Sequence, residues 1–521
     1  MELGASKWVS TVTLAFLSVL LTVTLWKLES NQAQFSFPGD ITNMILGKLE
    51  GWSLGEDGNK RGLKALGPNI TSCHPSYGRK DLLVHCCPPG FQTPVPFVDF
   101  QFPDPQSPLR VRRPAHVVDG DYIAKYNKAL SIMKSLPHDD PRSFSRQANL
   151  HCLFCTGAYD QQSHNAPLSI HRTWLFFPWH RMMIYFHERI IGSLIGDETF
   201  ALPYWAWDIP EGMVIPDMYT NKSSSFFHTE RDASHRPPKI ADLNYVSDTN
   251  LSREDQLDIN LSFMYNQMVS GARKTELFMG CRYKAGTEGY CNGPGTIELA
   301  PHNALHTWVG SSLNPGREDM GKFYSAARDP IFYAHHSNID RLWEVWREAN
   351  KHELDITDQD WLESFFFFYD ENLRLVRVKV ADVLDTIKLG YSYEQVHRPW
   401  LNKRPKAFFS TKTSSPNVEK EGEREQTTNV KHPLKGDAYV KFDVYVNLID
   451  ESKISPKFRE FAGTFAHIPG GAATIDLKLG VSELLEDLEA DQDETIWVTL
   501  LPRTPSCSNV TIGGVRMEYI E

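Results

Sequence analysis

The sequence has no excess of positive charge. Its 521 residues hold 54 Lys and Arg against 65 Asp and Glu, so the formal net charge is −11. This balance gives no electrostatic reason to expect nucleic acid or an anionic membrane surface as a partner. The sequence also lacks an internal repeat, and its length exceeds that of one typical domain. What it has in number is aromatic residues, with 13 Trp and 29 Phe, which suit large aromatic cores and an aromatic substrate.

The N-terminal residues are typical of a targeting segment rather than of a folded domain. Lys7 precedes an apolar run from Trp8 to Trp26. Such a run is typical of a secretory signal, and its length also fits a signal anchor. We therefore expect a signal peptide or signal anchor over residues 1–34. A polar spacer without a clear period follows over residues 35–72.

Glycosylation motifs favour the secretory pathway. Five stretches fit Asn-x-Ser/Thr, and together with the apolar leader they predict a glycoprotein. They begin at Asn69, Asn221, Asn250, Asn260 and Asn509.

The chain has eight cysteines, and in an oxidising compartment most of them should pair. The sequence alone does not fix the connectivity, and buried free thiols are the alternative. Cys86 and Cys87 are adjacent, so we expect them to have different partners. We suggest a further pair between Cys281 and Cys291.

Hydrophobic spacing predicts two long helices. Residues 119–136 place apolar side chains on one face, and residues 331–350 carry an apolar stripe. Residues 210–260 are polar and contain several of the glycosylation motifs, so we expect surface loops there.

Histidines lie at or near two further predicted helices. One helix begins at His180, because Pro178 suits a first helical turn. His171 lies nine residues earlier and would face the opposite side of a continuous helix, so it must lie on an irregular segment. His302 and His306 are four apart, and one helix would present both on the same face.

The C-terminal part has a different character. Residues 401–435 are rich in Lys, Glu, Ser, Thr and Pro, which predicts an exposed and cleavable linker. Beyond it, residues 440–447 alternate between apolar and polar and predict a strand, as do residues 495–500 and 510–519. We therefore expect a small β domain over residues 436–521.

Six histidines form two sets of three, which suggests two metal ions. Imidazole suits copper, zinc, iron and nickel. Di-iron bundles use Glu and Glu-x-x-His ligands, and this chain has no Glu-x-x-His near the candidates. A hydrolytic di-zinc site would also mix carboxylates with histidine, so histidine alone favours copper that cycles between Cu(I) and Cu(II) and binds dioxygen. The two sets are His151, His171 and His180, and His302, His306 and His336.

Several spaced motifs can be read along the chain, namely His151-Cys-Leu-Phe-Cys155, Phe176-Phe-Pro-Trp-His180-Arg, Pro301-His-Asn-Ala-Leu-His306, Asp329 to Asp340, Asp360-Trp-Leu362 and Lys441-Phe-Asp-Val-Tyr-Val-Asn447. They resemble the motifs of plant polyphenol oxidases, the type-3 copper family that includes catechol oxidase and tyrosinase. The resemblance covers the chain from about residue 73 to its end. It implies a mainly α catalytic domain over residues 73–400, in which a four-helix bundle with long loops holds two copper ions, and a small β-sandwich-like C-terminal domain.

The resemblance also implies ligands and cross-links. His151, His171 and His180 would bind copper A, and His302, His306 and His336 would bind copper B, with His335 beside them. Cys155 matches a cysteine that forms a thioether with His171, and such a bond would fix an imidazole that no helix holds. The family's disulfides would be Cys73–Cys87 and Cys86–Cys152.

Four further residues match positions that act on the substrate. Phe323 matches a bulky residue above copper A, and Glu298 matches a glutamate that holds a water near the site. Asn303 and Thr307 follow two copper B ligands at positions that shape substrate choice. The alternative for Glu298 is an exposed carboxylate at a helix start.

The resemblance implies an o-diphenol:oxygen oxidoreductase, which oxidises catechols to o-quinones with dioxygen as co-substrate and hydroxylates monophenols more weakly. Its partners would be small phenols and dioxygen, with no nucleic acid and no stable membrane partner unless the leader is an uncleaved anchor. One alternative is a specialised synthase acting on a plant phenolic at the same site. Another is an oxygen carrier like haemocyanin, but the helical His-x-x-x-His that carriers use at copper A is missing here.

Most plant members of this family carry a chloroplast transit peptide. This chain instead has the apolar leader and the glycosylation motifs, so we expect the secretory pathway and the vacuole. The apoplast and a membrane-anchored lumenal form are alternatives, and the chloroplast lumen is not expected. The C-terminal domain is expected to cover the site and keep the enzyme latent, with Phe465-Ala-His-Ile-Pro469 as the plug and Ile468 entering the site.

Overall fold

The structure is a computed structural model that describes most of the chain beyond residue 63. The segments expected as leader (residues 1–34), most of the spacer (35–72) and most of the linker (401–435) lie outside the described residues. The described ranges are 64–79, 82–287, 291–314, 316–350, 357–405, 439–448, 450, 454–468, 474–491 and 493–518.

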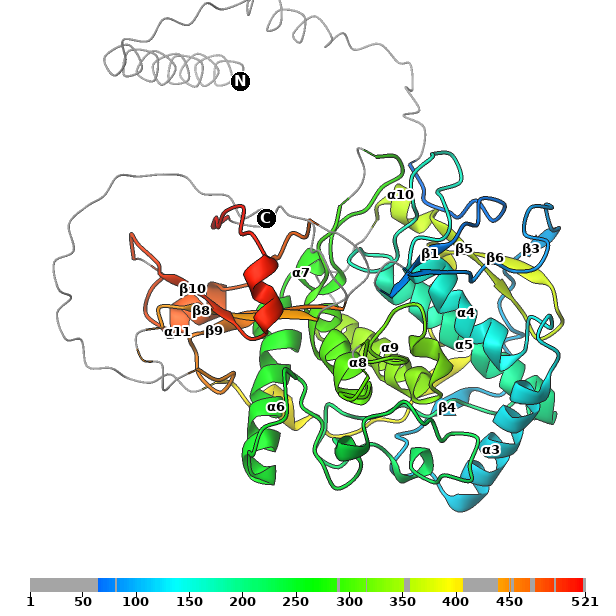
Figure 1. The fold of residues 1–521 in the computed structure, drawn as a ribbon, viewed down its shortest axis with the longest axis horizontal. Coiled ribbons are helices and arrows are strands. Elements are labelled where there is room, and N and C mark those ends of the chain that lie inside the picture. Colours follow the sequence, from blue (N-terminus) through cyan, green and yellow to red (C-terminus); the bar gives the residue numbers. More distant parts are fainter. Residues whose placement is uncertain are drawn as a thin grey trace, which may run out of the picture. The chain divides into compact units, whose positions relative to one another are not determined.

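Five of the described helices form the part of the fold that includes the candidate histidines (Figure 1). Helix α3 is capped by Asp119, and helix α4 by Ser143, whose side-chain oxygens accept hydrogen bonds from backbone N–H groups of the first turn. The predicted helices at 119–136 and 331–350 are confirmed as α3 and α9, and α5 begins at Phe176 rather than at His180. Helix α4, which carries His151, is missing from the prediction. The bounds are α3 (Gly120–Ser135), α4 (Phe144–Cys155), α5 (Phe176–Ile195), α8 (Asn303–Val309) and α9 (Ile331–Ala349).

The expectation of surface loops throughout residues 210–260 is wrong. Helix α6 (Arg253–Met268) begins after Ser252, whose hydroxyl accepts from the Asp255 N–H. Its Asn260 side chain is fully buried and donates from Nδ2 to Ala241 O at 2.7 Å. This burial excludes Asn260 as a glycosylation site in the folded chain. A short helix α7 (Thr275–Met279) follows.

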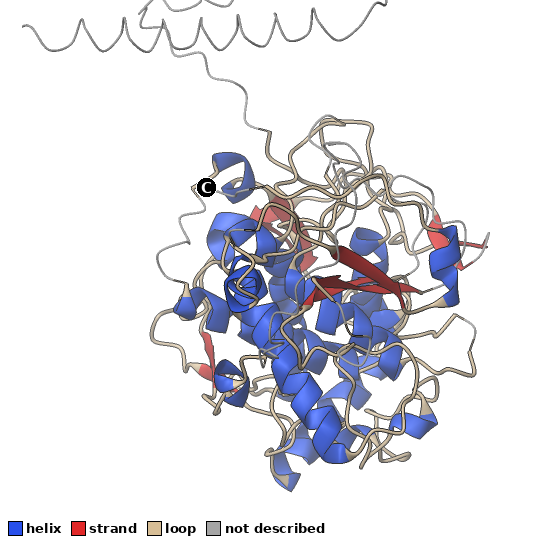
Figure 2. Ribbon diagram, turned by 90° about the vertical axis from the view of Figure 1, so that its left-hand side faces the viewer, coloured by secondary structure: helices blue, strands red, loops and turns tan. Residues whose placement is uncertain are grey.

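Short strands and turns complete the part before residue 405, and Figure 2 shows the long loops that join them to the helices. Strand β6 pairs antiparallel with β5 and parallel with β3, β1 pairs with β2, and β4 pairs with β7. None of the described helices is both long and apolar enough to cross a membrane. The bounds are β1 (Ser76–Arg79), β2 (Leu82–Val84), β3 (Phe97–Asp99), β4 (Arg110–Arg112), α10 (Gln359–Leu362), β5 (Phe365–Tyr369), β6 (Leu375–Lys379) and β7 (Tyr391–Tyr393).

Tight helical turns lie between these elements. One of them, η4 (Glu298–His302), is a π-helical turn that leads directly into α8. The others are the 3₁₀ turns η1 (Asp217–Tyr219), η2 (Ala233–His235), η3 (Ser270–Ala272), η5 (Ala326–Arg328), η6 (Val380–Val383), η7 (Pro399–Asn402) and η9 (Pro505–Asn509).

The described C-terminal residues form one antiparallel sheet in the order β10-β8-β9, with β8 (Val440–Val446), β9 (Phe461–His467) and β10 (Val498–Pro502). Helix α11 (Ser482–Asp487) lies beside it (Figure 1). The expected strand at 510–519 is wrong, because residues 510–518 contain none. The described residues also show no second sheet facing this one, so the sandwich-like arrangement is not found there.

Strand β8 is buried along its whole length, so its polar residues do not face solvent. Lys441 Nζ lies 2.9 Å from Asp443 Oδ1, and Thr464 Oγ1 of β9 donates to the same oxygen. Pairing of these charges permits their burial at the centre of the sheet. Strand β9 contacts α6, α8 and the turn η4, so the C-terminal sheet packs against the histidine-bearing part of the chain.

A buried ionic network joins α9 to three other elements. Asp340 of α9 accepts hydrogen bonds from Arg181 of α5 at 2.5 Å and from Arg112 of β4 at 3.3 Å. It also accepts from the Tyr391 and Tyr393 hydroxyls of β7. The positive charges of Arg181 and Arg112 hold the pKa of Asp340 below its usual value, although its burial raises it. The network therefore fixes the helix that carries His336 against the helix that carries His180.

Candidate metal centre

The first histidine group combines two helices and one loop. His151 lies on α4 and His180 on α5, whereas His171 lies in the loop before α5, on an irregular segment as the sequence predicts. The possible ligand atoms of these three and of Cys155 all lie within 4.8 Å of one another. His151 Nε2 and His171 Nε2 are 3.3 Å apart. The group is therefore close enough to share one metal ion.

The second group lies on α8 and α9. His302 ends the turn η4 directly before α8, His306 lies one turn later on α8, and His335 and His336 lie on α9. Their possible ligand atoms also lie within 4.8 Å of one another. The His180 and His336 rings stack with centroids 4.3 Å apart, so the two groups adjoin.

Hydrogen bonds to the outer nitrogens orient three of these rings. A carbonyl oxygen only accepts, so each bonded Nδ1 carries the proton and leaves Nε2 as a free electron pair. Such second bonds are typical of metal-binding histidines. The bonds run from His151 Nδ1 to Phe323 O at 2.6 Å, from His180 Nδ1 to Phe176 O at 2.8 Å and from His306 Nδ1 to Met320 O at 2.7 Å.

Burial keeps these rings neutral. Desolvation lowers the pKa of His151 to about 3 and that of His306 to about 4, and it lowers the pKa of His180 and His302 well below the usual value. A metal ligand must be a neutral imidazole. The Nε2 atoms of His180 and His302 are buried without a hydrogen-bond partner among the described residues. Buried, neutral and unpartnered nitrogens fit a bound metal ion in each group.

His335 and His336 differ in how their rings are held. Trp207 Nε1 donates to His335 Nδ1 at 3.1 Å. The neutral His335 ring must then carry its proton on Nε2, which removes that electron pair from metal binding. His336 Nε2 instead lies 3.4 Å from His306 Nε2. The geometry favours His336 over His335 as the ligand.

Glu298 is fully buried, not an exposed carboxylate at a helix start. Its Oε1 accepts from the Arg172 N–H at 2.6 Å and lies 3.0 Å from His171 Nδ1. Its Oε2 has no hydrogen-bond partner within the described part of the chain. Burial raises the pKa of Glu298 to about 8. The carboxyl group thus fixes the His171 loop and offers one oxygen for a further partner.

Asn303 and Thr307 are both buried on α8, with Asn303 at its first position and Thr307 one turn later. Asn303 Oδ1 lies 3.0 Å from His302 Nδ1, and its Nδ2 donates to Ala466 O of β9 at 2.9 Å. Thr307 donates its hydroxyl to Asn303 O at 3.0 Å. Asn303 therefore contacts both a candidate ligand and the C-terminal sheet.

Phe323 covers one side of the first group. Its ring centroid lies 4.3 Å from that of His171, and its carbonyl oxygen is the acceptor for His151. The side chain is therefore placed where it can limit access to the first metal position.

The described part of the chain contains three disulfides, namely Cys73–Cys87, Cys86–Cys152 and Cys281–Cys291. The first two attach the N-terminal segment to itself and to α4 beside His151. Cys155 and Cys507 have free sulfurs.

Two adjoining groups of neutral imidazoles, with the Glu298 carboxylate on the outer nitrogen of His171, define a dinuclear histidine centre of the type-3 copper class. Comparisons with known proteins agree with this class. Residues 141–349 match the "Common central domain of tyrosinase", residues 355–406 the "Polyphenol oxidase middle domain" and residues 401–519 the "Chloroplastic Polyphenol Oxidase C-terminal domain".

Similar proteins span most of the chain. It is 44% identical to aureusidin synthase of Antirrhinum majus, over 87% of this chain and 88% of that protein. It is 43% identical to the chloroplastic polyphenol oxidase of Vitis vinifera, over 84% and 79%. The structure of latent apple tyrosinase has a TM-score of 0.74 and 42% identity, and the match covers 81% of this chain and 99% of that one.

The chain belongs to the tyrosinase and polyphenol oxidase family. It is an oxidoreductase with a dicopper centre, and it oxidises catechols to o-quinones with dioxygen. Membership in this enzyme family removes the oxygen-carrier alternative. The predicted family, activity and copper cofactor are confirmed.

The predicted vacuolar destination is wrong. The polyphenol oxidases similar to this chain are named chloroplastic, including those of Vitis vinifera, Prunus armeniaca and Malus domestica. The family model that matches residues 401–519 is also named for chloroplastic enzymes. These findings point to the chloroplast. Asn-x-Ser/Thr motifs are too short to outweigh them, and one of them is buried at Asn260.

Sequence reasoning missed the groups that orient the ligands. Phe176, Met320 and Phe323 orient the ligands through backbone carbonyls, which any residue provides, so the residue type carries no signal for this role. For Trp207 the sequence gave a weak indication of a hydrogen bond, because an indole N–H in a buried aromatic segment needs an acceptor.

Proposed function

We propose that copper A is held by the first set of histidines and copper B by the second. When bound, the copper ions supply the redox chemistry with dioxygen, and the protein supplies position and access. The observation that carries this assignment is that the buried Nε2 atoms converge in each group while hydrogen bonds hold most of the outer nitrogens. The sets are His151, His171 and His180 for copper A, and His302, His306 and His336 for copper B.

We infer that these ligands are presented by four helices arranged as a bundle. Helices α4, α5, α8 and α9 each carry at least one proposed ligand, and α5 contacts α9 directly. Only His171 comes from a loop. Its support comes from Glu298, from Phe323 and from the proposed thioether.

The proposed thioether joins Cys155 to the His171 ring. Cys155 has a free sulfur in the same group of atoms as His151, His171 and His180. Forming the bond is a two-electron oxidation that removes the thiol hydrogen and one ring hydrogen, for which dioxygen, the co-substrate, would be the acceptor. The cross-linked peptide should therefore be lighter by two hydrogen atoms in mass spectrometry. A peptide map that shows unmodified Cys155 and His171 peptides in fully coppered protein would contradict the bond.

We propose that Phe323 and Thr307 set the fit of the phenol. Phe323 lies over the His171 ring, and Thr307 lies one residue after His306 in the same buried region. Changing either residue should alter the ranking among phenols more than the copper content.

Glu298 and Asn303 are proposed to hold a water that accepts the proton of a monophenol. The unpartnered Oε2 of Glu298 can accept a hydrogen bond from that water, and the Asn303 amide can orient it. The Asn303 Nδ2 is bonded to Ala466 of β9 in this structure. This role therefore requires that β9 first leave Asn303.

We propose that residues 436–521 form a domain that shields the site and that residues 401–435 form the linker whose cleavage releases it. Ala466 O binds Asn303, Ile468 is buried, and Leu299 of η4 packs within the C-terminal apolar core. Pro469, the last residue of the expected plug, lies outside the described residues. Ile468 is proposed as the side chain that enters the site.

The activity of the intact and the cleaved chain tests the shield. Limited proteolysis within 401–435, or mild detergent, should raise the rate of catechol oxidation. Clean removal of residues beyond 435 without any rise in rate would contradict it.

A specialised synthase remains the second candidate, since the chain is 44% identical to aureusidin synthase. A substrate panel on the activated enzyme separates the two. Comparable rates on many simple catechols support a general polyphenol oxidase, whereas a strong preference for one elaborated phenolic supports a synthase.

A further inference from the structure

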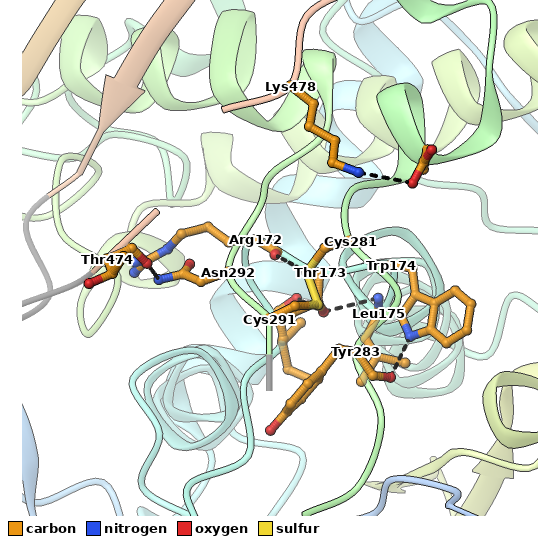
Figure 3. Close-up of a disulfide and its surroundings, with 12 residues drawn as sticks. Arg172, Thr173, Trp174, Leu175, Cys281, Tyr283, Cys291, Asn292, Thr474 and Lys478 are labelled. Atoms are coloured by element: carbon orange, nitrogen blue, oxygen red, sulfur yellow. Dashed lines mark hydrogen bonds and ion pairs between the residues drawn. A yellow bond between two sulfur atoms is a disulfide. The ribbon is translucent and has the colours of Figure 1, made fainter. Parts of the chain in front are cut away.

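The Cys281–Cys291 disulfide lies between the His171 loop and the C-terminal domain. Figure 3 shows Trp174 and Tyr283 on one side of it and Asn292 and Thr474 on the other. The pairing encloses a short stretch of chain, with a sequence separation of 10. The disulfide-bonded segment is therefore placed to restrain both the His171 loop and the C-terminal domain.

The contacts to the His171 loop are backbone hydrogen bonds. Trp174 N–H donates to Cys281 O at 3.0 Å, and Gly293 N–H donates to Arg172 O at 3.0 Å. Cys281 Sγ also lies 3.3 Å from Arg172 O. Arg172 follows His171 directly and has a left-handed φ of 65°. The residues at the Cys281–Cys291 disulfide thus help to hold the backbone next to His171, a proposed copper A ligand.

The contacts to the C-terminal domain all involve the residues just after Cys291. Asn292 Nδ2 donates to Thr474 O at 2.6 Å, and Asp476 N–H donates to Asn292 O at 2.9 Å. Gly293 approaches so closely that a Cβ there would lie 3.1 Å from Asp476 O. Ile475, between the two bonded residues, is buried in the C-terminal apolar core. Loosening Asn292 would therefore loosen a segment anchored in the shield.

This disulfide is also the most accessible of the three. Cys281 and Cys291 are both partly exposed, whereas Cys73, Cys86 and Cys152 are buried, so each of the other two disulfides has at least one buried sulfur-bearing residue. Thiol–disulfide exchange requires access of the attacking thiolate. A reductant should reach Cys281–Cys291 first.

We propose that Cys281–Cys291 is a redox-modifiable latch that keeps the C-terminal domain docked over the copper site. A dithiol attacks one sulfur, the S–S bond breaks, and the dithiol becomes a disulfide. Cys281 and Cys291 take up the two electrons and two protons as thiols. The reduced Cys281 keeps its backbone bond from Trp174, and its thiol can donate to Arg172 O. The His171 loop therefore stays in place while Asn292 gains freedom and releases residues 474–476. This latch rests on the proposed shielding function.

The first experiment locates the modification. The full-length, copper-loaded enzyme is treated with limiting dithiothreitol, alkylated and mapped by mass spectrometry. Cys281 and Cys291 should be alkylated before the other disulfide cysteines. Reduction of Cys86–Cys152 at the same dose would overturn the claim of selectivity.

The second experiment removes the disulfide without a reductant. The double variant Cys281→Ser/Cys291→Ser is compared with Cys507→Ser, which removes a free sulfur in the C-terminal domain. We expect hydrogen exchange at residues 474–476 to become at least tenfold faster only in the double variant. Its catechol oxidase rate should rise several-fold at unchanged copper content. Asn292→Ala, which keeps the disulfide but loses the bond to Thr474, should show the same direction of change.

Truncation separates the latch from the shield. After removal of residues beyond 435, the double variant and its parent should oxidise catechol equally fast. If truncation activates the enzyme but the double variant neither exchanges faster nor gains activity, the latch is wrong and the shield stands. If truncation itself gives no activation, the shield is wrong. Loss of copper from the double variant with unchanged exchange at 474–476 would mean that the disulfide serves the His171 loop alone and would also overturn the latch.

Discussion

The Asn303 side chain joins a proposed copper B ligand to the C-terminal strand β9. Its Oδ1 lies 3.0 Å from His302 Nδ1, and its Nδ2 donates to Ala466 O at 2.9 Å. One amide therefore contacts the metal site at one end and the proposed shield at the other. The proposed shielding and the proposed handling of the substrate would therefore be coupled at this residue.

Asn303→Asp should weaken docking of β9 while leaving His302 oriented. Aspartate keeps an oxygen for His302 but offers no donor to Ala466 O, and a buried acceptor without its donor costs about 1–3 kcal/mol. Less detergent should then be needed for activation, and amides of β9 should exchange faster. Exchange rates equal to those of the parent would show that this bond does not contribute to docking.

Acid should release β9 through His467. The ring is buried, and burial together with the positive charges of Arg172 and Lys322 lowers the pKa of His467 well below 6.5. The released strand binds a proton near pH 6.5 and the docked strand does not, so docking is favoured above that pH and weakens as the pH falls below it. The protection factors of the amides of residues 465–467, which are corrected for the slower intrinsic exchange at low pH, should therefore fall between pH 7.5 and pH 5.

His467→Gln provides the control, because glutamine does not titrate in this range. The protection factors of residues 465–467 should change less with pH in this variant than in the parent protein. The same pH dependence in both proteins would assign acid release to other groups.

Glu298→Gln should slow monophenol hydroxylation more than catechol oxidation. Glutamine retains an oxygen for the Arg172 N–H but is a poor proton acceptor, and a positioned base contributes about 100-fold or more to such a transfer. Rates on tyramine and catechol are measured after removal of the C-terminal domain. Asn303→Gly should likewise lower the rate on tyramine more than the rate on catechol. Equal losses on both substrates in the two variants would mean that Glu298 and Asn303 act through general site integrity.

Asp340→Asn should destabilise the catalytic part by about 3–5 kcal/mol, the usual cost of breaking a buried ion pair. Asp340 is the common acceptor for Arg112 and Arg181. Thermal unfolding of the copper-loaded protein measures the loss. Glu371→Gln is the comparison, because it weakens a more exposed pair with Arg189 and should cost less.

Much of the site could be predicted from sequence. The spacing of His302 and His306, and the apolar stripes of α3 and α9, follow the helical period and can be recognised in the sequence alone. The loop position of His171 followed from its spacing to His180. The positions of the histidines along the chain gave the grouping into two sets of three, and motif resemblance then gave the copper family.

Other features could not be predicted because their partners lie far away in the sequence. Helix α6 buries polar residues such as Asn260, so its pattern looks like a loop until Ala241 is placed beside it. Strand β8 looked half-exposed because Lys441 and Asp443 are polar, yet the two pair inside the sheet. Asn303 gave no sign of Ala466, since a backbone carbonyl has no sequence signature.

Metal content of the purified full-length protein tests the central assignment most directly. The account predicts two copper ions per chain by elemental analysis. His180→Ala should reduce this to one and abolish catechol oxidation, because α5 supplies a ligand of only one group. Stoichiometric zinc or iron in the native protein, or two coppers retained in His180→Ala, would contradict it.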